Sequence, residues 1–187
     1  MPVVPSSHPL PSAPQRILVA GTSGSGKTTL ARDLAAVLGI EHVEIDGLFH
    51  GPGWTPRPTF LQDVEELATR PSWVTEWQYA DARPVLAARA DLVVWLDLPR
   101  RTVMRQVVRR TLRRRLRREV LWNDNVEPPL ATLLSDRDHI VRWAWRTHHQ
   151  TAERVTRLAA ERPDLPIVRI RTRAEARAWP RTMIEPD

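Results

Sequence analysis

Two patterns of apolar and polar positions alternate along the chain: short apolar runs, and segments in which apolar residues recur every three or four positions. Short apolar runs at 16–20, 42–46, 72–77, 92–98 and 166–172 predict five strands. The fourth run, LVVWLDL, is almost continuously apolar, which is typical of a parallel strand buried on both faces. The last run alternates apolar and polar residues, which predicts a strand at the edge of the sheet.

Helical spacing fills the intervals between these runs. Apolar residues recur every three or four positions in the segments that follow residue 26, in 59–69, in about 100–121 and in about 137–161. The first of these helices is expected to stop at Gly39. Strands that alternate with helices predict an α/β fold, with an open and mostly parallel five-stranded sheet flanked by helices.

The two ends of this pattern suggest the domain organisation. Residues 1–14 contain five prolines and predict a disordered tail, because closely spaced prolines continue neither a helix nor a sheet ladder. Residues 15–187 are expected to form a single domain, with an arm at about 105–135. The opening segment has no basic and apolar regions of a signal peptide, and no apolar run approaches the roughly 18 residues of a membrane helix. A soluble cytoplasmic protein is the expectation.

Composition narrows the chemistry. The 187 residues include no cysteine, which excludes disulfides, cysteine nucleophiles and zinc sites built on thiolates. Basic residues outnumber acidic ones by 28 to 22, for a formal net charge of +6. Only one of the basic residues, Lys27, is a lysine, and it lies where a compact, flexible charge is useful.

That lysine belongs to a phosphate-binding motif. The segment Gly21-Thr22-Ser23-Gly24-Ser25-Gly26-Lys27-Thr28 matches G-x-x-x-x-G-K-[ST] at every fixed position, between a predicted strand and a predicted helix. Its glycines allow successive N–H groups to surround a phosphate next to the N-terminal end of the helix. Thr29, the residue after the motif, is also expected to contact the nucleotide. Lys27 is expected to reach the β- and γ-phosphates of ATP, and the Thr28 hydroxyl is expected to bind Mg²⁺.

Three acidic residues lie at predicted strand ends, where open α/β sheets bind their ligands. Asp46 would orient an acceptor hydroxyl or hold Mg²⁺ through water, or it would simply cap a turn. Glu76 would serve the metal or the acceptor, or remain solvated. Asp97 follows a buried strand as a metal-binding aspartate would, but Leu98-Pro99 comes next and favours a turn.

Ten arginines occur between residues 100 and 118. In a kinase, arginines of a closing lid stabilise charge on the transferred phosphoryl group. In a nucleic-acid-binding protein the same helix face would contact phosphates. A solvated basic face is the third interpretation, and it suits most of the ten. Arg110 and Arg114 are the best candidates for a functional role because they lie well into the arm.

Several segments together resemble a known group of proteins. These are GTSGSGKTTLA, EIDGLFHGPGWTPRP, SWVTEWQY, ARADLVVWLDLPRRTVMRQVVRRTLRR, EVLWNDNVEP and DHIVRWAWRTHH. They are similar to adenylate kinase-like P-loop proteins of the bacterial group often labelled "DNA topology modulation protein", over roughly 16–175. The resemblance implies a nucleoside monophosphate kinase-like fold with an acceptor segment after the second strand and an arginine-rich lid after the fourth.

The same resemblance assigns residues to the site by position. Asp46, Trp54 and Arg57 fall in the acceptor segment, Glu76 and Arg83 fall where such kinases contact the acceptor, and Arg110, Arg114 and Arg137 fall in or beside the lid. Thr172 and Arg173 fall in the loop that usually approaches adenine. One departure concerns the third strand, where many members of that group carry Asp-Gly-Asn-Tyr and this chain has Glu76-Trp77-Gln78-Tyr79. The tryptophan in place of glycine is expected to reshape the acceptor pocket.

The sequence therefore favours an ATP- and Mg²⁺-dependent kinase that acts on a small acceptor, either a nucleoside monophosphate or a similar metabolite. Two alternatives stay open: a nucleotide-switched regulator associated with nucleic acid, which the basic arm suggests but no recognised motif supports, and an NTPase without a transfer partner.

Overall fold

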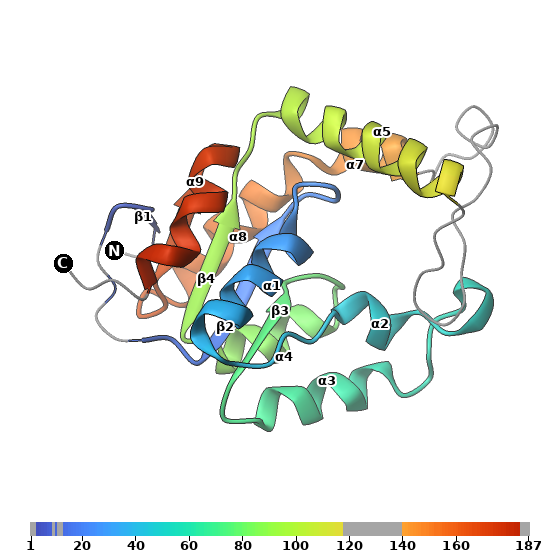
Figure 1. Ribbon diagram of the computed structural model, residues 1–187. Coiled ribbons are helices and arrows are strands. Elements are labelled where there is room, and N and C mark those ends of the chain that lie inside the picture. The colour runs from blue at the N-terminus through green and yellow to red at the C-terminus, as the bar shows by residue number, and fades with distance from the viewer. Residues whose placement is uncertain (1–2, 9, 11–12, 118–139, 184–187) are drawn as a thin grey trace.

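The computed structural model describes residues 3–8, 10, 13–117 and 140–183 (Figure 1). A five-stranded parallel sheet runs through its centre in the order β1-β5-β4-β2-β3. The strands are β1 (Val3–Pro5), β2 (Arg16–Gly21), β3 (Trp73–Glu76), β4 (Leu92–Leu96) and β5 (Ile167–Ile170). The predicted α/β architecture with a parallel sheet is therefore confirmed.

Helices cover both faces of the sheet. They are α1 (Lys27–Leu38), α2 (Ile45–Phe49), α3 (Phe60–Thr69), α4 (Ala82–Arg89), α5 (Arg100–Arg117), α7 (Ile140–Thr147), α8 (Gln150–Glu161) and α9 (Arg173–Ala178), with short 3-10 turns at Pro52–Trp54 and Trp179–Met183. In the part of the chain that these elements describe, no helix is long and apolar enough to span a bilayer.

Alternation along β2 divides the core into two layers. Leu18 and Ala20 point to the face covered by α3, α4 and α8, whereas Ile17 and Val19 point to the face covered by α1 and α9. All four are fully buried. Because apolar residues line both faces, the central strands read as continuous apolar runs in the sequence.

The prediction of a strand at 42–46 is wrong. Its pairing with β3 is a single bridge, His42 to Val74, and α2 begins at Ile45. Side chains of β3 take over where backbone pairing stops: the Thr75 hydroxyl donates to the Val43 carbonyl at 2.8 Å, and the Ile45 N–H donates to the Glu76 carboxylate at 3.1 Å. A strand would need those backbone groups for its own ladder.

The fifth strand comes instead from the N-terminal segment. Residues 3–5 pair with β5, so the expectation of a disordered tail over 1–14 fails there, and β5 is not at the edge. Val4 is buried, which stabilises the added strand, and Pro5 is tolerated because β1 is the edge strand.

The helix expected over 137–161 is divided into α7 and α8 at His148 and His149. The reason is tertiary: the main-chain carbonyl of His148 accepts a hydrogen bond from the Thr22 hydroxyl at 3.2 Å, and the His148 ring lies 3.0 Å from the Leu98 carbonyl oxygen. The break therefore faces the loop between β2 and α1.

Candidate functional site

The site begins at the loop between β2 and α1. Gly24 and Gly26 have φ values of +79° and +101°, a conformation that favours glycine over residues with a Cβ. The N-terminal end of α1 follows directly, with Lys27 as its first residue. Such a loop presents backbone N–H groups and the positive end of a helix dipole to an anion, as the sequence predicts.

Lys27 is the most strongly perturbed charge in this loop. Its side chain is buried, and its Nζ donates to the Thr22 carbonyl at 3.3 Å. Burial lowers its pKa to about 8, although the nearby Asp46 and Glu76 raise it, and Arg110 lowers it further. The structure thus brings three other predicted site residues, each from a different element, within electrostatic reach of Lys27.

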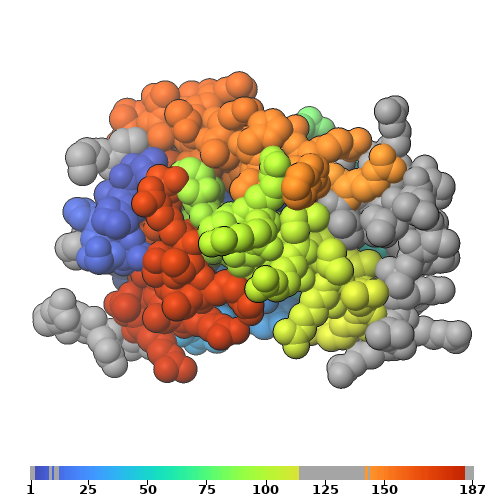
Figure 2. All heavy atoms as spheres, turned by 90° about the horizontal axis from the view of Figure 1, so that it is seen from above, coloured from blue at the N-terminus to red at the C-terminus, as the bar shows by residue number. Residues whose placement is uncertain are grey.

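Two helices hold the loop in place. Gln106 of α5 donates its side-chain amide to the carbonyls of Gly24 and Ser25, each at 3.3 Å. On the other side Thr22 contacts the α7–α8 junction, at the His148 carbonyl and at Thr151. Figure 2 shows α5 at the surface between α9 and α7. Sequence reasoning missed Gln106, although it is the only amide side chain in a helix otherwise rich in arginine.

Glu76 lies at the end of β3 and is 2% exposed. One carboxylate oxygen lies 3.2 Å from His42 Nε2, and the other accepts from the Ile45 N–H. Burial acts to raise the pKa of Glu76, but the hydrogen bonds from His42, Ile45 and the Thr28 hydroxyl outweigh it and hold the pKa below its usual value. Glu76 is therefore an ionised carboxylate beside Thr28, and His42 is a contact that the sequence did not indicate.

Asp46 lies in the first turn of α2. Its Oδ1 accepts hydrogen bonds from Gln78 Nε2 at 2.9 Å and from the Tyr79 hydroxyl at 2.6 Å. Burial and the neighbouring Asp46 carboxylate raise the pKa of Tyr79 well above its ordinary value, so Tyr79 remains a donor. Neither Gln78 nor Tyr79 was assigned to the site from the sequence, because their role depends on the close approach of α2 and β3.

Aromatic rings pack around Tyr79 and His50, on the side of the site where Asp46 lies. Phe49 stacks on Tyr79 with ring centroids 4.0 Å apart, and His50 meets Trp54 edge-on at 5.0 Å. Trp54 and Tyr79 both have positive φ values, of 61° and 56°. Strained backbone of this kind persists where surrounding contacts over-determine it, and it is common at ligand sites.

The Thr28 hydroxyl and the Glu76 carboxylate have the chemistry that Mg²⁺ prefers, and they lie next to each other at the mouth of the loop. Among the described residues no cluster of three His, Asp or Glu side chains could hold a metal ion by itself. Mg²⁺ usually takes few protein ligands and completes its shell with water and phosphate oxygens.

Asp97 does not join the site. It is ion-paired with Arg169 of β5, whose guanidinium also lies over the Trp95 ring at 4.7 Å. The Asp97 side chain is therefore engaged with Arg169. This favours a structural role for Asp97, in which it links the end of β4 to β5, over a role as a metal ligand.

Three other predicted residues have interactions of their own in the structure. Arg57 is paired with Asp63 at 3.0 Å. Arg83, at the start of α4, has a pKa lowered by burial and by the nearby Arg154. Thr172 caps α9 by accepting from the Glu175 N–H at 3.1 Å.

The remaining predicted residues are more peripheral or lie outside the description. Thr29 and Arg173 are exposed, Ser23 is half-buried, and Gly21 ends β2. Arg137 and the side chain of Arg114 lie outside the described residues. Of the residues predicted from the sequence, the structure brings Asp46, Glu76 and Arg110 near Lys27 of the phosphate loop, and the roles of these residues stay predictions.

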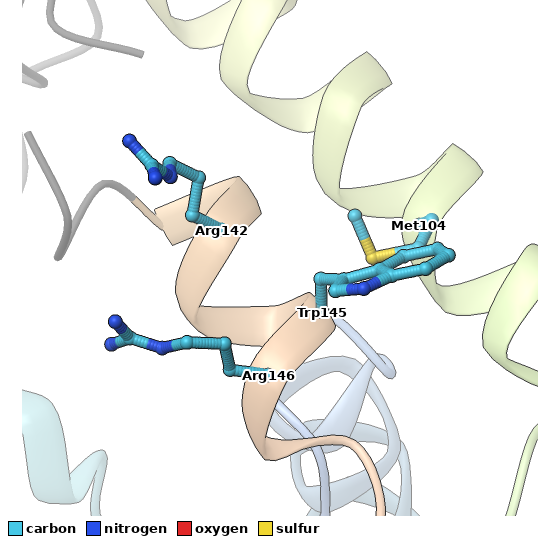
Figure 3. Close-up of a pocket in the computed structure, with 4 residues that line it drawn as sticks. All are labelled: Met104, Arg142, Trp145 and Arg146. Atoms are coloured by element: carbon cyan, nitrogen blue, oxygen red, sulfur yellow. The ribbon is translucent and has the colours of Figure 1, made fainter. Parts of the chain in front are cut away.

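A separate open pocket of about 380 Å³ lies between α5 and α7 (Figure 3). It is lined by Met104, Arg142, Trp145 and Arg146. Met104 lies against the Trp145 ring, and both arginines project from α7 away from that ring. Arg100 covers Trp145 at 4.6 Å from the ring centroid. Its described lining residues are apolar or basic and include no carboxylate.

Comparison with known proteins supports the fold. No protein-family model matches the chain, and no curated protein matches it. Among solved structures, a gluconokinase from Sinorhizobium meliloti aligns with a TM-score of 0.54 at 19% identity, over 92% of each chain. A shikimate kinase from Acinetobacter baumannii aligns at 23% identity with a TM-score of 0.49, over 91% of this chain and 90% of that one. A sugar kinase from a Janibacter species aligns at 22% identity with a TM-score of 0.46, over the same shares.

The chain therefore has the α/β fold of P-loop kinases, in agreement with the fold that the sequence indicated. At this level of identity the likeness concerns the fold alone. The narrower "DNA topology modulation" group stays a prediction.

Proposed function

We propose that this protein is an ATP-dependent kinase that transfers the γ-phosphoryl group of ATP to a small acceptor. The observation that carries the proposal is the position of Lys27, buried in the phosphate loop with Asp46, Glu76 and Arg110 all within electrostatic reach. A protein that only bound Mg²⁺ and nucleotide would use Glu76 beside Thr28 but would have no role for Asp46. A phosphotransferase needs both positively and negatively charged side chains at the point of phosphoryl transfer.

The residues divide into two roles. The N–H groups of the loop and Lys27 bind the phosphates of ATP, and Arg110 of α5 stabilises the charge that develops during transfer. Thr28 and Glu76 would hold Mg²⁺, which supplies charge neutralisation at the phosphates when bound. Thr172 and Arg173, in the loop after β5, are proposed to lie near the adenine.

The acceptor is proposed to bind over α2 and the end of β3, next to Asp46 and Glu76. Trp54, Arg57 and Arg83 belong to the same side of the site in this proposal. A small metabolite or a nucleotide suits this region, and the gluconokinase that shares the fold acts on a small molecule according to its name. Arg137 is proposed to contribute from beside the lid.

The test is ATP turnover with Mg²⁺ over a panel of nucleoside monophosphates, nucleosides and small hydroxy-acids. We expect one acceptor class to raise ADP release well above the rate without acceptor, and Lys27→Ala to abolish the increase. Arg32→Ala is the matched control on the same helix, because Arg32 is exposed and paired with Glu44. Tight ATP binding without any acceptor-dependent turnover would contradict the kinase function and favour an NTPase without a transfer partner.

The basic α5 is the observation behind the second candidate, a nucleotide-switched regulator associated with nucleic acid. Its described arginines at 101, 105, 109 and 113 are exposed. Binding of duplex DNA or RNA that weakens steeply with salt, together with no acceptor-dependent turnover, would favour this candidate over the kinase.

A further inference from the structure

Asp46 is held through one of its two carboxylate oxygens. Gln78 and Tyr79 both donate to Oδ1, at 2.9 Å and 2.6 Å. Within the described part of the chain, Oδ2 makes no hydrogen bond. Asp46 is half-buried, and with Oδ1 already occupied its Oδ2 is available to accept a hydrogen bond from a bound molecule.

Tyr79 is itself fixed from several sides. Its ring stacks on Phe49 at 4.0 Å and meets Phe60 edge-on at 5.2 Å, and its hydroxyl lies 3.2 Å from His50 Nε2 as well as against Asp46. Its φ of +56° is unfavourable for a residue with a Cβ, so these contacts have to outweigh backbone strain. The result is a hydroxyl donor that cannot easily turn away from Asp46.

The charges around the reacting position limit which acceptor fits. Asp46 and Glu76 both act on Lys27, as does the cation Arg110, so all three lie near the place that the γ-phosphate would occupy. An acceptor that attacks through a phosphate would bring about two further negative charges toward these carboxylates at neutral pH. An acceptor that attacks through a hydroxyl brings none, and its proton has a partner in Asp46 Oδ2.

We propose that the acceptor is an alcohol, a hydroxylated small molecule rather than a nucleoside monophosphate phosphorylated on its phosphate, and that Tyr79 is the positioning residue of Asp46. This inference rests on the proposed kinase function. In the transfer step the acceptor oxygen forms a bond to the γ-phosphorus while the bond from that phosphorus to the β–γ bridging oxygen breaks. ADP leaves with the electron pair, and the hydroxyl proton passes to Asp46 Oδ2, which later releases it to water. The products are a phosphate monoester, ADP and a proton.

The experiment uses the full chain, ATP and Mg²⁺ with matched pairs of compounds, each an alcohol and the phosphate monoester of that alcohol. Phosphorus NMR identifies the product. We expect a new phosphate monoester from at least one alcohol. A phosphoanhydride made from a monoester would overturn this proposal and leave the kinase function intact. Neither product, with ATP still bound, would count against both.

The role of Tyr79 is tested on the alcohol that gives most product. Tyr79→Phe keeps the ring and its stacking but removes the donor to Asp46. We expect kcat to fall roughly tenfold or more, while the KM for ATP stays within about twofold, because general-base contributions are about 10²- to 10⁴-fold. Asp46→Asn is expected to lower kcat further.

Thr69→Val is the control, since it removes a hydroxyl that bonds only to Glu66 on the outer helix α3. Gln78→Met removes the second donor to Asp46 and serves if Tyr79→Phe does not fold. An unchanged kcat in Tyr79→Phe, or equal losses of kcat and ATP affinity, would show that Tyr79 acts only in packing.

Discussion

Val107 of α5 packs directly against Gly24 of the phosphate loop. A Cβ built on Gly24 would lie 2.1 Å from the nearest methyl carbon of Val107. Gln106, one residue earlier, donates to the carbonyl oxygens of the same loop. The helix that carries the arginines is therefore seated on the loop by shape as well as by hydrogen bonds, and it brings Arg110 into reach of Lys27.

Gly24→Ala is expected to disturb this contact. The new methyl group meets Val107 and also strains a backbone at φ +79°. Gly39→Ala is the matched control, because Gly39 has a similar φ of +68° and open space around it. We expect about 1 kcal/mol of destabilisation in the control and roughly 1–3 kcal/mol more in Gly24→Ala, with weaker nucleotide binding. Thermal unfolding and calorimetry measure both, and equal effects in the two variants would argue against the seating of α5 on the loop.

Nucleotide binding is expected to take up protons near pH 8. Burial lowers the pKa of Lys27 to about 8, so about half of the side chains are neutral at that pH, and bound phosphates favour the charged form. An uptake of roughly half a proton follows. Calorimetry in two buffers of different ionisation enthalpy measures it. Lys27→Arg should show none, because arginine stays charged. Equal uptake in both proteins would assign the protons to another group.

Tyr79 is expected to resist ionisation. It is the only tyrosine in the chain, so the tyrosinate absorbance reports on this residue alone. Burial and Asp46 raise its pKa above the ordinary 10.0, so the unfolded chain releases its proton first and stability falls as the pH rises above about 10. Asp46→Asn should lower the pKa of Tyr79, whereas Asp81→Asn, two residues away, should not. A titration at the ordinary value in the native protein would contradict the burial of Tyr79.

Two carboxylates at strand ends are expected to behave differently. Glu76→Gln should lower Mg²⁺-dependent nucleotide binding roughly tenfold while metal-free binding changes little, because it removes a charge beside Thr28. Asp97→Asn should cost about 1 kcal/mol of stability, since its pair with Arg169 is partly exposed, and should leave the Mg²⁺ dependence unchanged. The reverse outcome would make Asp97 the metal-side residue.

Local spacing was a good guide to part of this fold. The motif from Gly21 to Thr28 is contiguous, so its role could be predicted without knowing what surrounds it. The apolar run at 92–98 and the helical period over 59–69 were interpreted correctly for the same reason, and β4 and α3 lie within those ranges. Each depends on the period of one element and on neighbours in the chain.

The wrong expectations have a shared physical cause. Val3–Pro5 forms a strand because β5 offers it an unpaired edge, and the segment at 42–46 ends its pairing because Thr75 and Glu76 bind its backbone groups. A prediction from local propensity does not include a partner that lies far away in the sequence.

The sequence by itself determined that a phosphate loop joins a buried strand to a helix, because the geometry of that loop depends on residues adjacent in the chain. Only the tertiary structure decided that Gln106 and Val107 support the loop, that Asp97 is bound by Arg169, and that Tyr79 holds Asp46. Those contacts join residues that are more than thirty positions apart, so they exist only once the packing of the sheet and its helices has brought the elements together.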